Sequence, residues 1–349
     1  MADAAQLAII KKGAHAWNQW RKQQPASNGN LAEIGIHPPA TLREANLSLM
    51  DLEAINLGQV DLCMALLQGA NLRAANLRKA LLYTANLQSV DLIGADLESA
   101  DLREADLSLS NLTNANLAHA NLQRATLYTS NLREANFHKA DLNLANLGEA
   151  DLSLSNLSDA NLQEANLREA TLYTANLRKA TLQDAVLMGA DLREADMTMA
   201  VLRETNFHRA NLCTAIFSVA NLIGATLYRA NLCMANLSLA NLCMANLIEA
   251  DLHRATLVGA NLIGANLYKA NLQEANFNQT DLREATLCMA NLAGADLRQA
   301  NLCMANLREA RFYKANLSGA NLHHATLWQA SLDGAYLSGA TMPDGSVHE

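Results

Sequence analysis

Large apolar side chains recur at every fifth position of this 349-residue chain, from Leu42 to Met342. The 61 positions hold 54 Leu, five Phe and two Met, and the register is never interrupted. A β-strand has a side-chain period of two, so a five-residue step would place these residues on alternate faces. An α-helix advances by about 100° per residue, so the same step would spread them around the helix. The chain must therefore change direction once in each five-residue unit, which predicts a solenoid.

The other four positions of the unit indicate how it turns. Ala lies two residues before the large apolar residue in 52 of the 61 units, and Asn, Asp, Thr or Ser lies between them in 54. We expect the Ala and the large residue to point inward from a short extended segment. The polar side chain between them can bond a nearby backbone N–H and support a corner. The last two residues of each unit are polar or varied, and we expect them to face water.

This pattern resembles the pentapeptide repeat family, whose motif reads A-(D/N)-L-x-x. The runs ANLRKATL from Ala175 and ANLCMANLSLANLCMANL from Ala230 are this motif, and the resemblance covers about residues 40–342. It implies an all-β fold, a right-handed quadrilateral (four-sided) parallel β-helix with four repeats per coil and about 15 coils. Leu and Ala would fill its interior and leave no pore.

The ends of the chain differ from the repeats. Residues 4–22 are predicted to form a helix, because Leu7, Ile10, Ala14 and Trp17 recur at helical spacing. Since a solenoid has an open apolar end, we expect a lid there rather than a cofactor or nucleic-acid role for Trp17 and Trp20. The segment from Trp17 to Arg21 resembles the N-terminal cap of cyanobacterial members of the family. The predicted organisation is a capping helix at 1–24, a linker at 25–40, the β-helix at 41–342 and a tail at 343–349; either this tail or a partner would cover the other end.

The charge, hydropathy and cysteine content of the chain limit its possible partners and its cellular compartment. The net charge is −8, but many acidic residues directly follow an Arg, so direct binding of nucleic acid is not expected. No apolar run is long enough to span a membrane or to form the core of a signal peptide. All six Cys lie just after the large apolar residue, where they are expected to face outward unpaired, which fits a reducing compartment and a cytoplasmic protein.

A coil of 20 residues would stack outward residues that lie 20 apart. Tyr228, Ile248, Tyr268 and Cys288 would then share one face, with Ile223, Cys243 and Ile263 on the next. A contiguous apolar area of this kind often marks a protein interface, although a stacked ladder can also simply stabilise a sheet. We call this candidate protein-binding area the apolar surface; it comprises Ile223, Tyr228, Cys243, Met244, Ile248, Ile263, Tyr268 and Cys288.

No pattern indicates catalysis. Cys213, Cys233 and His253 would stack on one face, but a straight ladder about 4.8 Å apart suits a tetrahedral zinc site poorly, and Gln273 follows them. The chain has no glycine-rich phosphate loop and no nucleophile motif. A filled interior also leaves no pocket for a substrate. We therefore expect no enzyme, no cofactor and no metal.

The favoured function is a rigid, non-catalytic scaffold for protein–protein interaction, with an unidentified protein partner and no membrane. Weak self-association through an end or through the apolar surface is left open. The resemblance offers an alternative, a DNA-mimicking modulator of DNA gyrase or topoisomerase, since some members resemble B-DNA in shape and charge. Such members carry a C-terminal helical dimerisation cap and often projecting loops, neither of which is seen here. The negative charge would come from ten Asp residues: Asp51, Asp61, Asp91, Asp96, Asp101, Asp106, Asp141, Asp151, Asp191 and Asp196.

Overall fold

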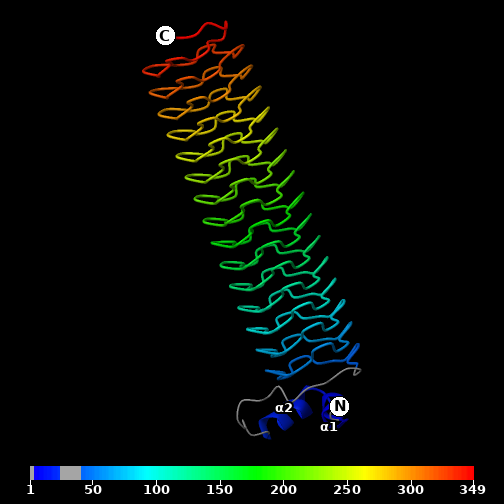
Figure 1. Cartoon of the computed structure of the whole chain (residues 1–349). Helices are drawn as coiled ribbons and strands as arrows, with labels where there is room; N and C mark the ends of the chain where they lie inside the picture. The colour runs from blue at the N-terminus through cyan, green and yellow to red at the C-terminus, as the bar shows by residue number, and fades with distance from the viewer. Residues whose placement is uncertain (1–3, 24–40) are drawn as a thin grey trace. The chain divides into compact units, whose positions relative to one another are not determined.

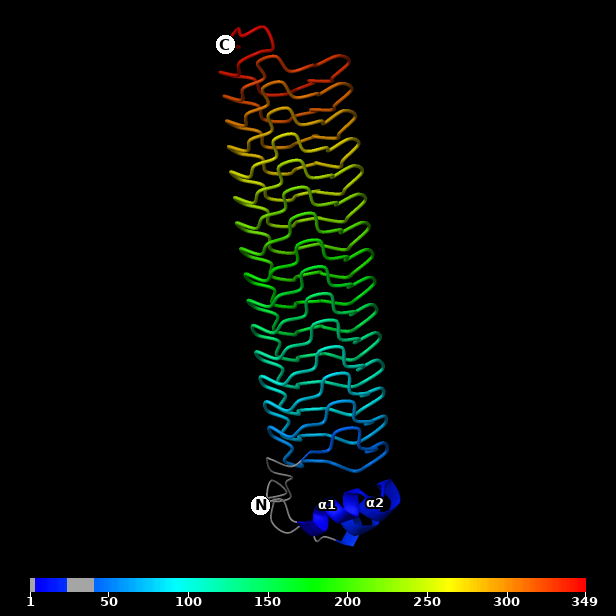
Figure 2. The ribbon, with the colours of Figure 1, turned by 90° about the vertical axis from the view of Figure 1, so that its right-hand side faces the viewer.

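Residues 4–23 and 41–349 are described by a computed structural model. They belong to two compact units, Met1–Asn176 and Leu177–Glu349. Figures 1 and 2 show the successive turns of the chain within each unit from two directions. The linker predicted at 25–40 lies outside the described residues.

Residues that lie 20 apart pair as parallel bridges throughout both units. Asp51 pairs with Asn71 in the N-terminal unit, and Asn231 pairs with Asp251 in the C-terminal unit. The N–H of Leu52 donates to the carbonyl oxygen of Asn71 at 2.7 Å, and the N–H of Asn71 donates back to Met50 at 2.9 Å. One coil therefore contains 20 residues, or four five-residue units, and its backbone is satisfied by the coils before and after it.

Each five-residue unit ends in a tight turn. We call its large apolar residue the central residue and the two that follow the first and second outward residues. The carbonyl oxygen of central Leu42 accepts the N–H of Ala45 at 3.0 Å, and the second outward residue between them, Glu44, has a φ of 58°. A positive φ at the third position of a turn is typical of type II. Non-glycine residues rarely adopt a positive φ. Its recurrence here reflects the backbone hydrogen bonds between adjacent coils, which we call the ladder and which hold each turn in place.

In many units the polar residue before the central residue supports this turn, as its position predicted. The side-chain oxygen of Asn46 accepts the N–H of Ser48 at 3.1 Å, and that of Asn231 accepts the N–H of Cys233 at 3.1 Å. Many of these side chains also bond to one another between coils, as when Asn76 donates to Asn56 at 2.9 Å. The Asn and Asp residues thus fix the turn locally and align neighbouring coils.

The central residues form the core. From Leu42 to Leu322 they are all buried, including the five Phe, whereas Leu327, Leu332, Leu337 and Met342 are only half-buried. Most inward positions two residues earlier are buried Ala, but five carry a hydroxyl. Thr205 donates its hydroxyl to Leu182 at 2.8 Å, while the hydroxyl of Ser155 is buried without a hydrogen-bond partner.

The N-terminal segment contains two helices, α1 (Ala4–Ile10) and α2 (Ala14–Gln23), so the single helix predicted at 4–22 is wrong. The chain breaks at Gly13, whose φ of 91° is accessible mainly to glycine. In α2, Trp17 is fully buried and its indole N–H donates to the carbonyl oxygen of Asp51 at 2.6 Å. The Asn18 side chain accepts the Asp51 N–H at 2.8 Å and donates to Leu49 at 3.0 Å.

The last residues return along the final turn. Thr341 and Val347 form an antiparallel bridge, and the N–H of His348 donates to Ala340 at 2.8 Å. The tail thus pairs with one segment of the last coil. The central residues Leu327, Leu332, Leu337 and Met342 of this coil stay half-buried. Within the described residues, neither helix has the length and apolar character needed to cross a membrane.

Candidate functional site

The ladder places the members of the apolar surface on successive coils. The N–H of Arg229 donates to Ile248 at 3.0 Å and that of Glu249 donates to Tyr268 at 2.9 Å. The N–H of Gly224 donates likewise to Cys243 at 3.0 Å. Tyr228, Ile248 and Tyr268 therefore follow one another on one side of the coils, and Ile223, Cys243 and Ile263 follow one another on the neighbouring side.

The apolar surface is less accessible than its sequence suggests. Seven of its eight residues are half-buried, and only Met244 is well exposed, at 65 %. The two tyrosine rings carry cations, since the Arg229 guanidinium lies 5.0 Å from the Tyr228 ring centre and the Lys269 ammonium 5.1 Å from that of Tyr268. The ring of His208 also stacks on Tyr228 at 5.3 Å. Each tyrosine therefore has a cation over its ring, and the Tyr228 ring is also stacked on His208.

A more exposed apolar stripe lies on another side of the same unit. Met199, Val219 and Leu239 are 49 %, 50 % and 64 % exposed and occupy the second outward position of three consecutive coils. We call these three residues the uncharged stripe. None of the ten outward residues on this side, from Thr198 to Gln279, is charged: Thr198, Met199, Ser218, Val219, Ser238, Leu239, Val258, Gly259, Asn278 and Gln279.

The turn geometry explains why the sequence analysis missed this stripe. The second outward residue has a positive φ, and its side chain is generally more exposed than that of the first outward residue. The prediction used the 20-residue spacing mainly on first outward residues, which the ladder half-covers. The same spacing applied to second outward residues would have identified Met199, Val219 and Leu239.

Two of the exposed apolar side chains lie over glycines of the next coil. The Cδ2 atom of Leu239 is 2.9 Å from where a Cβ of Gly259 would lie, and the sulfur of Met244 is 2.5 Å from that position on Gly264. A larger residue at either glycine would displace the side chain above it. The two glycines thus leave room for Leu239 and Met244 to lie along the surface.

Most of the carboxylates that could mimic DNA are paired with Arg. Arg103 donates to Asp101 at 2.6 Å and Arg193 donates to Asp191 at 2.7 Å. These hydrogen bonds lower the pKa of both Asp side chains below its usual value. An Arg nitrogen lies within 4.0 Å of eight of the ten predicted residues: Asp51, Asp61, Asp91, Asp96, Asp101, Asp151, Asp191 and Asp196.

Several Arg residues have a different partner from the one that the sequence suggested. Many Arg residues were expected to neutralise the Glu that follows them, and Arg43 does lie 3.9 Å from Glu44. Arg103, Arg193 and Arg283 form ion pairs with the Asp two residues earlier. In these three units the same Asp also accepts the backbone N–H of the Arg, so the two residues are neighbours within the turn.

The cysteines are less exposed than predicted. Cys63 is buried and the other five are half-buried, because the ladder covers the first outward position. Cys213, Cys233 and His253 do follow one another on three coils, since Thr214 donates to Cys233 at 2.9 Å and Met234 donates to His253 at 2.9 Å. Within the described parts of the chain, no group of three or more His, Cys, Asp or Glu residues is placed to hold a metal ion.

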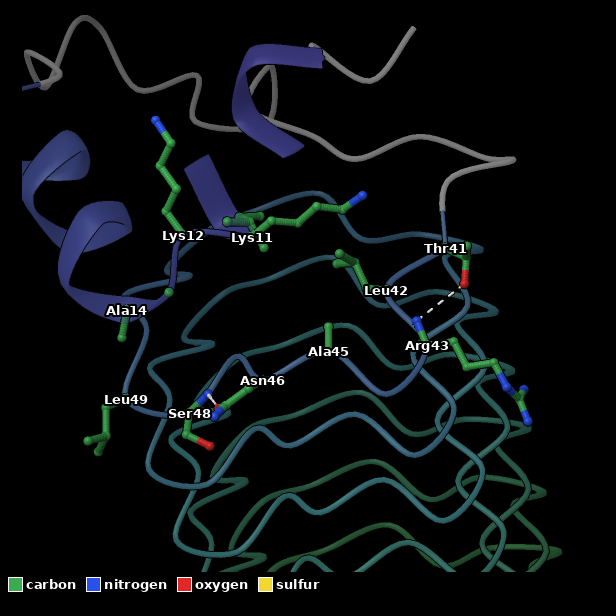
Figure 3. Close-up of a pocket in the computed structure, with 12 residues that line it drawn as sticks. Lys11, Lys12, Ala14, Thr41, Leu42, Arg43, Ala45, Asn46, Ser48 and Leu49 are labelled. Carbon is green, nitrogen blue, oxygen red and sulfur yellow. Dashed lines mark hydrogen bonds between the residues drawn. The ribbon is translucent and has the colours of Figure 1, made fainter. Parts of the chain in front are cut away.

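A pocket of about 670 Å³ lies between the junction of the two helices and the first turn of repeats, so the expectation of no pocket is wrong at this end. Figure 3 shows Lys11 and Lys12 on the helical side and Arg43 on the repeat side. Among the residues that the structure describes, the lining contains no carboxylate, imidazole or thiol, and its polar groups include Thr41 and Asn46, which bond the N–H groups of Arg43 and Ser48. The described lining therefore offers no set of metal ligands.

Comparisons with known proteins agree with the repeat pattern. The profile of the family described as "Pentapeptide repeats" matches stretches that span most of residues 45–344, and this match implies a right-handed β-helix, as predicted. HetL of Nostoc sp. strain PCC 7120, a pentapeptide repeat protein involved in heterocyst differentiation regulation, is 34 % identical over 71 % of this chain and 91 % of its own, with a TM-score of 0.26. Rfr23 of Cyanothece 51142 is 42 % identical over 25 % of this chain and 58 % of its own, with a TM-score of 0.25. QnrB1, a plasmid-mediated fluoroquinolone resistance protein, is 20 % identical over 56 % of this chain and 88 % of its own, with a TM-score of 0.27. No relative was found among curated proteins.

Proposed function

Since this chain belongs to the pentapeptide repeat family, we propose that it is a non-catalytic scaffold that binds a protein partner through its C-terminal unit. The observation that carries this proposal is the pair Leu239 and Met244, which are 64 % and 65 % exposed and lie five residues apart in one coil. Exposed apolar side chains that adjoin other apolar residues, as these adjoin the uncharged stripe and the apolar surface, often mark a protein interface. The binding area would combine the uncharged stripe with the apolar surface.

The side chains of this area indicate which chemical groups a partner surface should present. The outward side chains at Ser218, Ser238 and Asn278 supply hydroxyl and amide groups, while the stripe between them carries no charge. The cations at Arg229 and Lys269 lie on the side that carries the tyrosines. A partner surface with an apolar centre and a rim of hydrogen-bonding or acidic groups would complement this arrangement.

We also propose that α2 caps the N-terminal unit. In the ladder, the N–H of a residue such as Asp51 bonds to a carbonyl one coil earlier, as Asn71 does with Met50. Here the side chain of Asn18 accepts the Asp51 N–H instead, and Arg21 donates to the carbonyl oxygen of Glu53 at 2.9 Å. The helix would thereby shield a solenoid edge that is otherwise open to pairing with another chain.

DNA mimicry has less support. A DNA-like surface needs carboxylates whose charge reaches a partner, whereas eight of the ten Asp residues have an Arg nitrogen within 4.0 Å. Asp141 accepts a hydrogen bond from Gln123 at 2.5 Å, and Asp106 accepts one from Gln88.

The described cysteines are unpaired, and we propose a reducing, cytoplasmic setting on that ground.

Comparative capture tests the scaffold proposal. Tagged wild-type protein, the variant Leu239→Ser/Met244→Ser and the variant Tyr228→Ser/Tyr268→Ser would each be incubated with lysate of the organism that encodes the chain. The matched control is Leu109→Ser/Leu154→Ser, which removes two apolar side chains, 65 % and 49 % exposed, from the N-terminal unit. We expect proteins captured by the wild type and the control to be lost from both test variants. Equal capture by all four proteins would contradict the proposal, and captured gyrase would favour the alternative function.

A further inference from the structure

Cys213 and Cys233 are the one pair of cysteines in the sequence that lie 20 residues apart. The polar residues Asn211 and Asn231 that precede them form a parallel bridge, and the Asn231 amide donates to the Asn211 side chain at 3.1 Å. Each cysteine N–H bonds to its own Asn, at 3.3 Å for Cys213 and 3.1 Å for Cys233. The two cysteines are therefore held in equivalent positions on adjacent coils.

The spacing of adjacent coils brings the two cysteines close together. Both are unpaired, and the Cys213 thiol adds to the effect of burial in raising the pKa of the Cys233 thiol. Neighbouring in-register strands are about 4.8 Å apart, which falls within the Cα–Cα range of roughly 4.4–6.8 Å found in disulfides. The other four cysteines have no cysteine one coil before or after them.

We propose that Cys213 and Cys233 form an oxidisable dithiol, which a small disulfide such as oxidised glutathione converts to an intrachain disulfide between adjacent coils. One cysteine thiolate attacks a glutathione sulfur, forms a mixed disulfide and releases the first glutathione thiolate. The second cysteine thiolate attacks the protein sulfur of this mixed disulfide and releases the second glutathione thiolate. Two electrons pass from the cysteines to glutathione, and the two cysteine protons leave with the two glutathione products.

The burial of the two thiols determines how the exchange depends on pH and which oxidants can reach them. Burial raises the pKa of the Cys233 thiol, so less thiolate is present at neutral pH and exchange should accelerate as the pH rises. Both thiols are half-buried rather than enclosed, so a small disulfide can reach them. The bond would close a ring of one coil and tie the coil containing Cys213 to the next one.

Thiol counting with peptide mapping tests this inference. The reduced full-length protein would be treated with oxidised glutathione and alkylated, and its remaining thiols would be counted after unfolding. We expect the six thiols of the sequence to fall to four, with tryptic peptide 210–229 joined to peptide 230–254. A reductant should reverse both changes, and the oxidised protein should melt at a higher temperature than the reduced one.

Single substitutions identify the pair. Cys213→Ser and Cys233→Ser should each form no intrachain disulfide and lose at most one of their five thiols, as a glutathione mixed disulfide on the remaining cysteine of the pair, whereas the matched controls Cys243→Ser and Cys303→Ser should each fall from five to three. The Cys243→Ser control also leaves a single cysteine in peptide 230–254, which fixes the linkage. Six unchanged wild-type thiols, lasting glutathione adducts on Cys213 and Cys233 of the wild type, covalent dimers, or loss of two thiols in Cys213→Ser would each overturn the proposal. Circular dichroism would show that every variant retains the fold.

Discussion

The indole N–H of Trp17 donates a 2.6 Å hydrogen bond to the backbone carbonyl oxygen of Asp51. Elsewhere in the ladder a carbonyl at this position accepts a backbone N–H from 19 residues earlier, as Asn71 accepts that of Leu52. At Asp51 this carbonyl oxygen accepts a side-chain donor from α2. The neighbouring Asn18 accepts the Asp51 N–H, so side chains of a short helix bond both backbone groups of Asp51.

Replacing Asn18 with Leu should destabilise the N-terminal unit. The change removes the acceptor of the Asp51 N–H and the donor to Leu49, and it leaves a part-buried N–H unsatisfied. We expect a loss of about 1–3 kcal/mol in the free energy of unfolding, measured by urea denaturation. Gln19→Leu, on the exposed side of the same helix, is the control and should change stability little. Equal stability of both variants and the wild type would contradict the proposed capping role of α2.

Leu192→Lys should be far more damaging than the same substitution at Leu239. Leu192 is fully buried, so its replacement places an ammonium group in the apolar core without a partner. Leu239 is 64 % exposed, and a lysine there reaches water. Thermal unfolding should show loss of several kcal/mol, or of cooperative folding, for Leu192→Lys alone. Similar melting of the two variants would contradict the assignment of inward and outward positions.

Ser155→Ala should stabilise the protein. The Ser155 hydroxyl is buried without a hydrogen-bond partner, and Ala occupies the same position in most units. Removing an unsatisfied buried hydroxyl should raise the free energy of unfolding by about 1 kcal/mol. Thr205→Ala is the opposite case, because the Thr205 hydroxyl donates to Leu182 at 2.8 Å and its loss should cost about 1 kcal/mol. Chemical denaturation that ranks the two variants the other way would refute this account.

Stability should fall in acid through the Asp residues that Arg pairs. Hydrogen bonds from Arg103, Arg193 and Arg298 lower the pKa of Asp101, Asp191 and Asp296. A lowered folded-state pKa stabilises the fold above the unfolded pKa, about 3.9, and this contribution disappears as the pH falls through the folded value. The triple variant with Asn at these three positions should therefore show a flatter decline in melting temperature below about pH 4. A slope equal to that of wild type would show that these pairs contribute no pH-dependent stability.

The sequence predicts the repeat and its inward face because the central residue recurs at an exact spacing. Leu52 and Leu192 could be assigned to the core without coordinates, and Asn46 to the support of a turn, since each role depends only on its position in the unit. The candidate surface was predicted only in part. Which outward residue is more exposed depends on the sign of φ at residues such as Leu239, and the five-residue pattern does not reveal it.

Contacts between coils were the hardest to predict. The Arg73–Asp91 pair joins residues 18 apart at 3.1 Å, and its geometry depends on how two coils align. The break between α1 and α2 was also missed, although Gly13 marks it, because the apolar spacing of Ile10 and Trp17 continues across the break.

Methionine oxidation footprinting of the captured complex tests the scaffold proposal most directly. Met199 and Met244 lie in the proposed binding area and are 49 % and 65 % exposed, whereas Met304 is 56 % exposed and lies outside it. The protein would be exposed briefly to hydrogen peroxide, alone and with its captured partner, and sulfoxide would be measured at each Met by mass spectrometry. We predict that the partner slows oxidation of Met199 and Met244 while Met304 reacts at the same rate in both samples. Unchanged oxidation of Met199 and Met244 in the complex would contradict binding through this surface.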